Sequence, residues 1–338
     1  MTCVQTTKKL TPIKVNPERS TQSESPVTRD EQEQLMSVTG SLMWICRCSR
    51  PGIAYSVSKL QSAVRKAVVS DLLLANKVVK YVQDDPDAGI TFRAGLQWPE
   101  VVGEKPTFSI AAVSDASHGG EFEYLDDWKA HEAFRSQGAK LIFLADPGIA
   151  TNERATVHLI SFGSTVQKRV VNSTIKAETY QITDVVEAAD LIRATVADLH
   201  GQLDHDDWER TAAAWTHSVW FTDCRSAYDT LQKPIAKSVD KRLGIELAAL
   251  RQLLWRRPGS ASPDRRELEE RPREPTDLIR WIDTVVMVAD CLTKAMKENY
   301  LRQVLDTNVW DLKQPQSAKD IKSRKQQQRR RKDDDVDE

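Results

Sequence analysis

The stretch FSIAAVSDAS, residues 108–117, decides the fold of this chain. Its first six residues form a short run of aromatic, β-branched and small side chains, which is typical of a buried strand. Asp115 follows directly after this run. Because ligand sites in α/β sheets gather at strand ends, the sequence predicts a functional carboxylate at this position.

Strand and helix patterns continue on both sides of this strand. Apolar residues at helical spacing dominate residues 31–82. Further strands are expected at residues 89–93, 140–144, 155–161, 218–222 and 277–282, and later helices at residues 176–199, 225–231, 239–255 and 288–297. This arrangement predicts a mixed α/β domain.

Composition excludes several classes of protein. Of the 338 residues, 40% are hydrophobic, which is enough apolar material for a folded core. Lysine and arginine total 48 against 49 acidic residues, so a uniformly basic nucleic-acid coat is excluded while local basic patches are not. Five cysteines without regular spacing favour a reducing compartment, the cytoplasm or the nucleus. No apolar run of about 18 residues is present, so no membrane partner is expected.

The two ends of the chain have the composition of disordered segments. Residues 1–30 contain three prolines and few apolar residues, so we expect a disordered leader there. Residues 314–338 change from a basic run to an acidic one, and we expect a disordered tail. The basic cluster at residues 329–332 is a candidate nuclear localisation signal.

The chemistry of the chain is expected at four carboxylates near strand ends and helix starts. These are Asp115, Glu178, Asp223 and Asp290. Each one alone fits an ordinary helix cap or a solvated loop charge. Four acids that converge would repel one another unless a cation offsets them, and oxygen ligands of this kind suit Mg²⁺ or Mn²⁺.

Six short motifs, in order along residues 31–300, carry a resemblance to a known family. Residues 39–44 (TGSLMW) and 49–57 (SRPGIAYSV) resemble "GSLLYL…TRPDIAYAV", and residues 77–82 (KVVKYV) resemble "KRILRYL". The other four patterns, "SDAD", "SSTEAEY", "DNQSA" and "LADILTK", are matched by residues 114–117 (SDAS), 173–180 (STIKAETY), 222–227 (TDCRSA) and 288–294 (VADCLTK). The chain resembles the C-terminal part of a copia-type (Pseudoviridae) retrotransposon Pol polyprotein.

This resemblance implies a domain organisation. Residues 31–95 would be a helical remnant of the reverse transcriptase connection. Residues 105–300 would form a ribonuclease H-like domain, a mixed five-stranded sheet flanked by helices, and residues 301–313 a C-terminal extension. Protein partners would be the remaining Pol polyprotein or its reverse transcriptase.

The resemblance also assigns the four acids to a centre that holds two Mg²⁺ or Mn²⁺ ions. Asp115 would bridge both ions, Glu178 and Asp223 would complete the site on the leaving-group side, and Asp290 would hold the ion that presents the attacking water. The reaction would be hydrolysis of the RNA strand of an RNA–DNA hybrid, with the 2′-hydroxyl distinguishing RNA from DNA.

The sequence departs from the family pattern at several positions. Ser117 replaces an acid, Gly52 replaces the aspartate of "TRPD", and Lys176 replaces the first glutamate of "STEAEY". The polymerase palm motif is not found before residue 31, so DNA synthesis by this chain is not expected.

Two other functions are weighed against the nuclease. A non-catalytic or decayed remnant that binds nucleic acid is the first alternative. The second is a DDE-type transposase or integrase, which would need the order Asp–Asp–Glu, whereas here the glutamate comes second.

Basic residues in two segments are candidate contacts for the hybrid backbone, although solvated helix faces have the same pattern. They are Lys59, Arg65, Lys66, Lys241 and Arg242.

Overall fold

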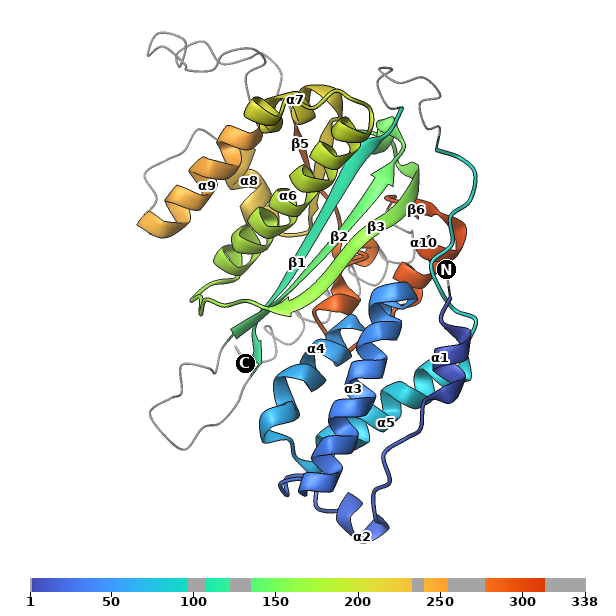
Figure 1. Cartoon of the computed structure of the whole chain (residues 1–338). Helices are drawn as coiled ribbons and strands as arrows, with labels where there is room; N and C mark the ends of the chain where they lie inside the picture. Colours follow the sequence, from blue (N-terminus) through green and yellow to red (C-terminus); the bar gives the residue numbers. More distant parts are fainter. Residues whose placement is uncertain (1, 97–106, 122–134, 233–239, 255–276, 314–338) are drawn as a thin grey trace, which may run out of the picture.

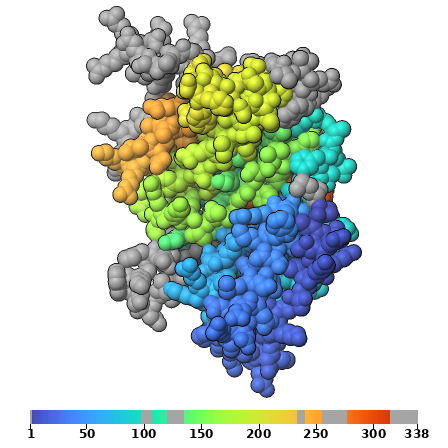
Figure 2. Space-filling model, in the orientation of Figure 1, coloured from blue at the N-terminus to red at the C-terminus, as the bar shows by residue number. Residues whose placement is uncertain are grey.

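The computed structural model describes residues 2–96, 107–121, 135–232, 240–254 and 277–313. The predicted disordered tail, residues 314–338, lies outside these ranges. Within them the chain forms a helical prefix followed by a curved sheet with helices packed on it (Figure 1). Figure 2 shows the prefix directly against the sheet-bearing part of the molecule.

The prefix is built on three helices, which the apolar spacing predicted. They are α3 (Arg29–Ser49), α4 (Ala54–Ala63) and α5 (Val69–Asp84), joined by the short 3₁₀ helices η1 (Pro51–Ile53) and η2 (Val64–Lys66). A capping box starts α3. The Thr28 hydroxyl accepts a hydrogen bond from the Glu31 backbone N–H, and the Glu31 carboxylate accepts one from the Thr28 backbone N–H. Arg19 pairs with Glu31 at 2.8 Å and ties the preceding segment to this helix start.

Residues 2–29 differ from the disordered leader that the sequence predicted. They contain the helices α1 (Val4–Lys9) and α2 (Pro17–Ser20), and Leu10 and Ile13 are buried in the core. The reason is long-range: the Asn76 side chain on α5 accepts from the Ile13 backbone N–H at 2.7 Å and donates to its carbonyl at 2.9 Å. These contacts order a segment that contains few apolar residues of its own.

The sheet contains six strands in the order β5-β4-β1-β2-β3-β6. Strands β1 (Ser109–Glu121), β2 (Arg135–Ala145) and β3 (Arg154–Val166) are antiparallel neighbours, and η4 (Pro147–Ala150) lies between the last two. Strands β4 (Ser218–Thr222) and β5 (Leu278–Trp281) run parallel to β1. The predicted mixed α/β class is therefore confirmed.

The two faces of this sheet are covered by different parts of the chain. Ile110 and Ala112 of β1 pack toward α6 (Thr174–Leu199), whereas Ala111 and Val113 face the helical prefix. This alternation follows from the two-residue period of a strand. The α6 side also carries η5 (His205–Asp207), α7 (Trp208–Trp215), α8 (Arg225–Gln232) and α9 (Lys241–Leu254).

The sheet has one strand more than the five that were predicted. Residues 301–313, predicted as an extension, contribute most of helix α10 (Asn299–Thr307) and all of β6 (Val309–Asp311), which pairs with β3. Asn308 has a positive φ of 55° and turns the chain from the helix into the strand. Trp310 is fully buried against Phe221, with ring centroids 4.9 Å apart, so this segment belongs to the core.

Two further expectations were wrong. Residues 89–93 form only an isolated bridge at Gly89, because Asn308 bonds the Thr91 and Arg93 backbones and replaces a strand partner. The expected helix at residues 288–297 is reduced to the 3₁₀ helix η7 (Asp290–Leu292), which follows η6 (Thr284–Val286). Its buried apolar residues are two adjacent pairs, Val288–Ala289 and Cys291–Leu292, and this pattern suits an irregular core segment better than an amphipathic helix.

Candidate metal centre

Asp115 lies near the middle of β1, because the strand continues beyond Val113, where the sequence predicted its end. It is only 2% exposed and stands opposite Ala139 of β2. Its odd-numbered position places it on the same face as Ala111 and Val113, toward the prefix and η7. The Thr293 hydroxyl donates a short hydrogen bond to Asp115 Oδ2 and fixes the carboxylate.

Asp223 follows β4 and reaches the same place because β4 runs parallel to β1. Two residues from the neighbouring strand β5 and the segment after it hold Asp223: Trp281, the last residue of β5, and Thr284, the first residue of η6. Thr284 Oγ1 donates to Asp223 Oδ2 at 2.8 Å, and Trp281 Nε1 donates to the Asp223 backbone carbonyl at 3.0 Å. The parallel register of β4 with β1 therefore places Asp223 at the edge of the acidic centre.

Asp290 comes from η7, which contacts η1 and α4 of the prefix. Buried neighbours Ala289 and Leu292 anchor this short helix, so Asp290 projects from a fixed backbone. Lys294 Nζ lies 2.5 Å from Asp290 Oδ1. The centre therefore contains a cation of its own.

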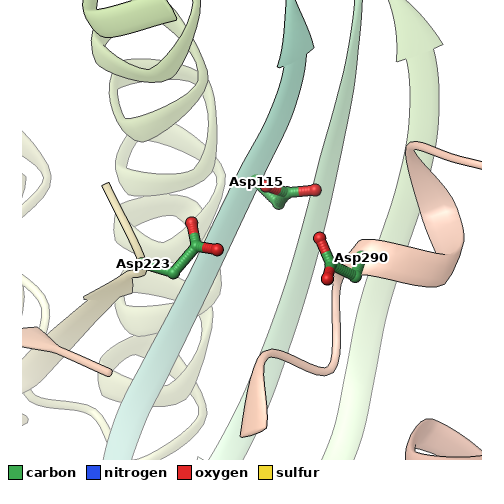
Figure 3. Close-up of side chains that lie close together, drawn as sticks. All are labelled: Asp115, Asp223 and Asp290. Atoms are coloured by element: carbon green, nitrogen blue, oxygen red, sulfur yellow. The ribbon is translucent and has the colours of Figure 1, made fainter. Parts of the chain in front are cut away.

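The three aspartates converge. Asp115, Asp223 and Asp290 each offer a carboxylate oxygen, and these oxygens lie within 4.8 Å of one another. Figure 3 shows the three side chains pointing toward a common space from β1, from the end of β4 and from η7. Residues separated by more than 170 positions are thus brought together, as the sequence predicted for these three.

Glu178 stands beside this group but is not one of the three. It lies in the second turn of α6, is 3% exposed, and accepts a hydrogen bond from the Ala116 backbone N–H. Among the described residues its other oxygen, Oε2, has no hydrogen-bond partner. The fourth predicted acid is therefore adjacent to Asp115, with a buried oxygen left unsatisfied.

The electrostatics of the centre disfavour ionised carboxylates. Burial, with the charges of Asp290 and Asp223, raises the pKa of Asp115 to about 7 against the lowering influence of Lys294. Burial and the charges of Asp115 and Asp223 raise the pKa of Glu178 well above its usual range. Burial also raises the pKa of Asp223. Burial alone would lower the pKa of Lys294, but the surrounding carboxylates outweigh it and raise that pKa.

These residues fit a divalent cation. The donors that converge are all carboxylate oxygens, the hard ligands that Mg²⁺ and Mn²⁺ prefer. The unsatisfied Oε2 of Glu178 offers a further oxygen at the margin of the group. A bound divalent ion would offset the burial and the repulsion that raise the pKa values of Asp115 and Glu178.

Sequence reasoning missed the residues that support the acids. Thr284, Thr293 and Lys294 contact Asp223, Asp115 and Asp290 respectively. Thr293 and Lys294 stand in the motif at residues 288–294, so the signal was present, but nothing in their spacing shows which acid each one contacts.

The five predicted backbone-binding residues are all exposed. Lys59 lies on α4, a helix that contacts η7, while Arg65 and Lys66 form part of η2. Lys241 and Arg242 begin α9, beside the start of α6, where Lys176 pairs with Asp240. The structure places the two groups in different parts of the molecule, and their role in binding stays a prediction.

Comparison with known proteins gives little. No protein-family model and no curated protein match the chain. A solved structure of LC11-RNase H1, isolated from compost by a metagenomic approach, is similar over 60% of this chain and 94% of its own, with 11% identity and a TM-score of 0.30. A likeness this weak assigns no activity. Any assignment of activity must therefore rest on the geometry of the acidic centre. No helix in the described ranges has the length and apolar character needed to cross a membrane.

Proposed function

We propose that the chain is a metal-dependent ribonuclease H of retrotransposon origin, with the RNA strand of an RNA–DNA hybrid as its substrate. The observation that carries this proposal is the convergence of Asp115, Asp223 and Asp290 within 4.8 Å, with Glu178 buried beside them. Four acids picked from separate motifs would not be expected to meet unless the motifs describe one centre.

Each residue of the centre has a defined task in this proposal. Asp115, Asp223 and Asp290 would hold the divalent ions, and Glu178 would complete their ligand set through its unsatisfied oxygen. Bound Mg²⁺ or Mn²⁺ supplies Lewis-acid activation of water and stabilises charge on the leaving oxygen. Thr293 and Thr284 orient two of the carboxylates by donating hydrogen bonds to them.

The burial of Asp115 and Glu178 also supports hydrolysis. Buried carboxylates with raised pKa values are costly to keep, so they are typical of functional sites. Selection for RNA would use contacts to the 2′-hydroxyl, the group that distinguishes the two strands of a hybrid. The exposed basic residues on α4 and α9 would contact phosphates without reading sequence.

The deciding experiment is cleavage of an end-labelled RNA–DNA hybrid in Mg²⁺, with Asp115→Asn as the inactive variant. Asp198→Asn is the matched control, because Asp198 is an exposed acid at the far end of α6. We expect cleavage by the parent and the control and none by Asp115→Asn. Equal cleavage by all three, or none by the parent in Mg²⁺ or Mn²⁺, would reject catalysis at this centre. Binding without cleavage would favour the non-catalytic remnant.

A further inference from the structure

A second candidate site lies along the edge strand β5. A pocket of about 340 Å³ opens there, lined by residues of β5, α8 and the β2–β3 connection. This volume is at the lower end of the range of small-ligand pockets. Among the residues that the structure describes, its walls contain two arginines and no carboxylate. The pocket therefore favours a ligand that carries negative charge.

One wall of the pocket is a stack of an arginine with two aromatic rings. The guanidinium carbon of Arg225 lies 5.1 Å from the centre of the Trp281 ring and 5.5 Å from that of Tyr228. Asp229, one turn along α8, accepts from Arg225 Nε at 3.0 Å and sets the direction of the guanidinium. Planar guanidinium and aromatic groups are the surfaces on which nucleobases stack.

The second arginine is fixed on the other side of the pocket. Arg280 Nη1 donates to the Ile149 carbonyl at 2.6 Å and to the Asn152 carbonyl at 2.7 Å. Two neutral acceptors hold the side chain in place without cancelling its charge. A positioned arginine of this kind suits a phosphate group.

The pocket is connected to the acidic centre. Trp281, which forms part of its wall, donates through Nε1 to the Asp223 carbonyl at 3.0 Å. Arg225 follows Asp223 by two positions along the chain. The pocket and the acidic centre therefore share Trp281 and the segment that follows Asp223.

We propose that this pocket binds one nucleotide of the substrate strand beside the cleavage position, with its base against Arg225 and Tyr228 and its phosphate toward Arg280. This inference rests on the proposed function and adds a substrate-positioning site to it. Stacking of this kind tolerates any base, because each base has a flat face. The pocket would thus fix the register of the strand without sequence preference.

The test measures binding without cleavage. Tyr228→Ala is combined with Asp115→Asn, and fluorescence anisotropy gives the dissociation constant for a labelled hybrid at one salt concentration. A series of hybrids is compared, in which each hybrid has a single abasic residue at a different position of one strand. We expect Tyr228→Ala to weaken binding between about fivefold and about a hundredfold. The weakening should vanish with one particular abasic position, because the stacked base is already missing there.

Phe92→Ala is the matched control, since Phe92 is an aromatic residue that is 49% exposed and absent from the pocket walls. Unchanged binding by Tyr228→Ala, or an equal loss with every abasic hybrid, would overturn the inference. Its failure is distinguishable from that of the proposed function, because cleavage is measured separately on chains with intact carboxylates. If the parent cleaves the hybrid while Tyr228→Ala binds it normally, the pocket proposal is rejected and the proposed function still stands.

Discussion

Lys294 Nζ lies 2.5 Å from Asp290 Oδ1, so a lysine of the chain neutralises part of the acidic centre. Its charge also acts on Asp115 and Asp223. An ammonium in this position competes with a divalent ion for the same oxygens. The chain thus supplies a counter-ion of its own to these carboxylates.

Replacing this lysine should strengthen metal binding. In Lys294→Met the carboxylates lose a competing cation, and we expect Mn²⁺ to bind about tenfold more tightly, a change of about 1.4 kcal/mol. Isothermal titration calorimetry, with Mn²⁺ added to the metal-free protein, measures this affinity directly. Lys297→Met, an exposed lysine on the same segment, should bind as the parent does. Unchanged or weaker Mn²⁺ affinity in Lys294→Met would contradict the competition.

Stability of the metal-free protein should fall as pH rises from about 4 to about 7. The pKa of Asp115 increases on folding, from 3.8 to about 7, so the folded state binds more protons and is favoured at low pH. Ionisation on raising the pH then costs folding free energy. We expect the melting temperature in EDTA to drop more between pH 5 and pH 8 for the parent than for Asp115→Asn. Parallel pH profiles would show that Asp115 is not responsible.

Gly52 should tolerate a carboxylate only if Glu298 is removed. A Cβ at residue 52 would lie 0.9 Å from Glu298 Oε2, so the carboxylate of Glu298 fills the space of a side chain at this position. We expect Gly52→Asp to destabilise the protein by about 1–3 kcal/mol through overpacking and charge repulsion. Urea unfolding of Gly52→Asp, Glu298→Ala and the double variant measures the coupling. Additive effects in that cycle would contradict a shared space.

Trp310→Ala should be among the most destabilising single changes in the sheet. The ring is fully buried against Phe143 and Phe221, and its Nε1 donates to the Val286 carbonyl at 3.1 Å. Truncation leaves a cavity that costs about 3–5 kcal/mol. Trp44→Ala is the matched control, because Trp44 is 60% exposed and its loss should change the free energy of unfolding little. A small effect of Trp310→Ala in urea unfolding would show that β6 is dispensable.

Short-range patterns predicted the elements that depend on local chemistry. The start of the strand that carries Asp115, the helix that carries Glu178 and the strand before Asp223 are found close to where their residues indicated. The convergence of Asp115 with Asp223 also followed, because the parallel pairing of β4 with β1 places the residue after β4 beside the middle of β1.

Features that depend on distant contacts were not predictable in this way. Ile13 is ordered by Asn76, and Trp310 is buried by residues from three other segments, so neither depends on its own neighbours in sequence. Lys294 is similar: its motif places it near Asp290, but only the fold shows that its charge reaches Asp115 and Asp223.

The apolar core on the prefix side of the sheet has a consequence for how this chain can be inherited. That core runs without interruption from Leu42 and Leu60 of the prefix to Val113 and Phe221 of the sheet. A gene fragment that began at residue 105 would expose to water the apolar surface that the prefix covers on this side of the sheet. A recombination event that separated the sheet from the helical prefix would therefore expose apolar surface on both parts, so we expect the two to be inherited together.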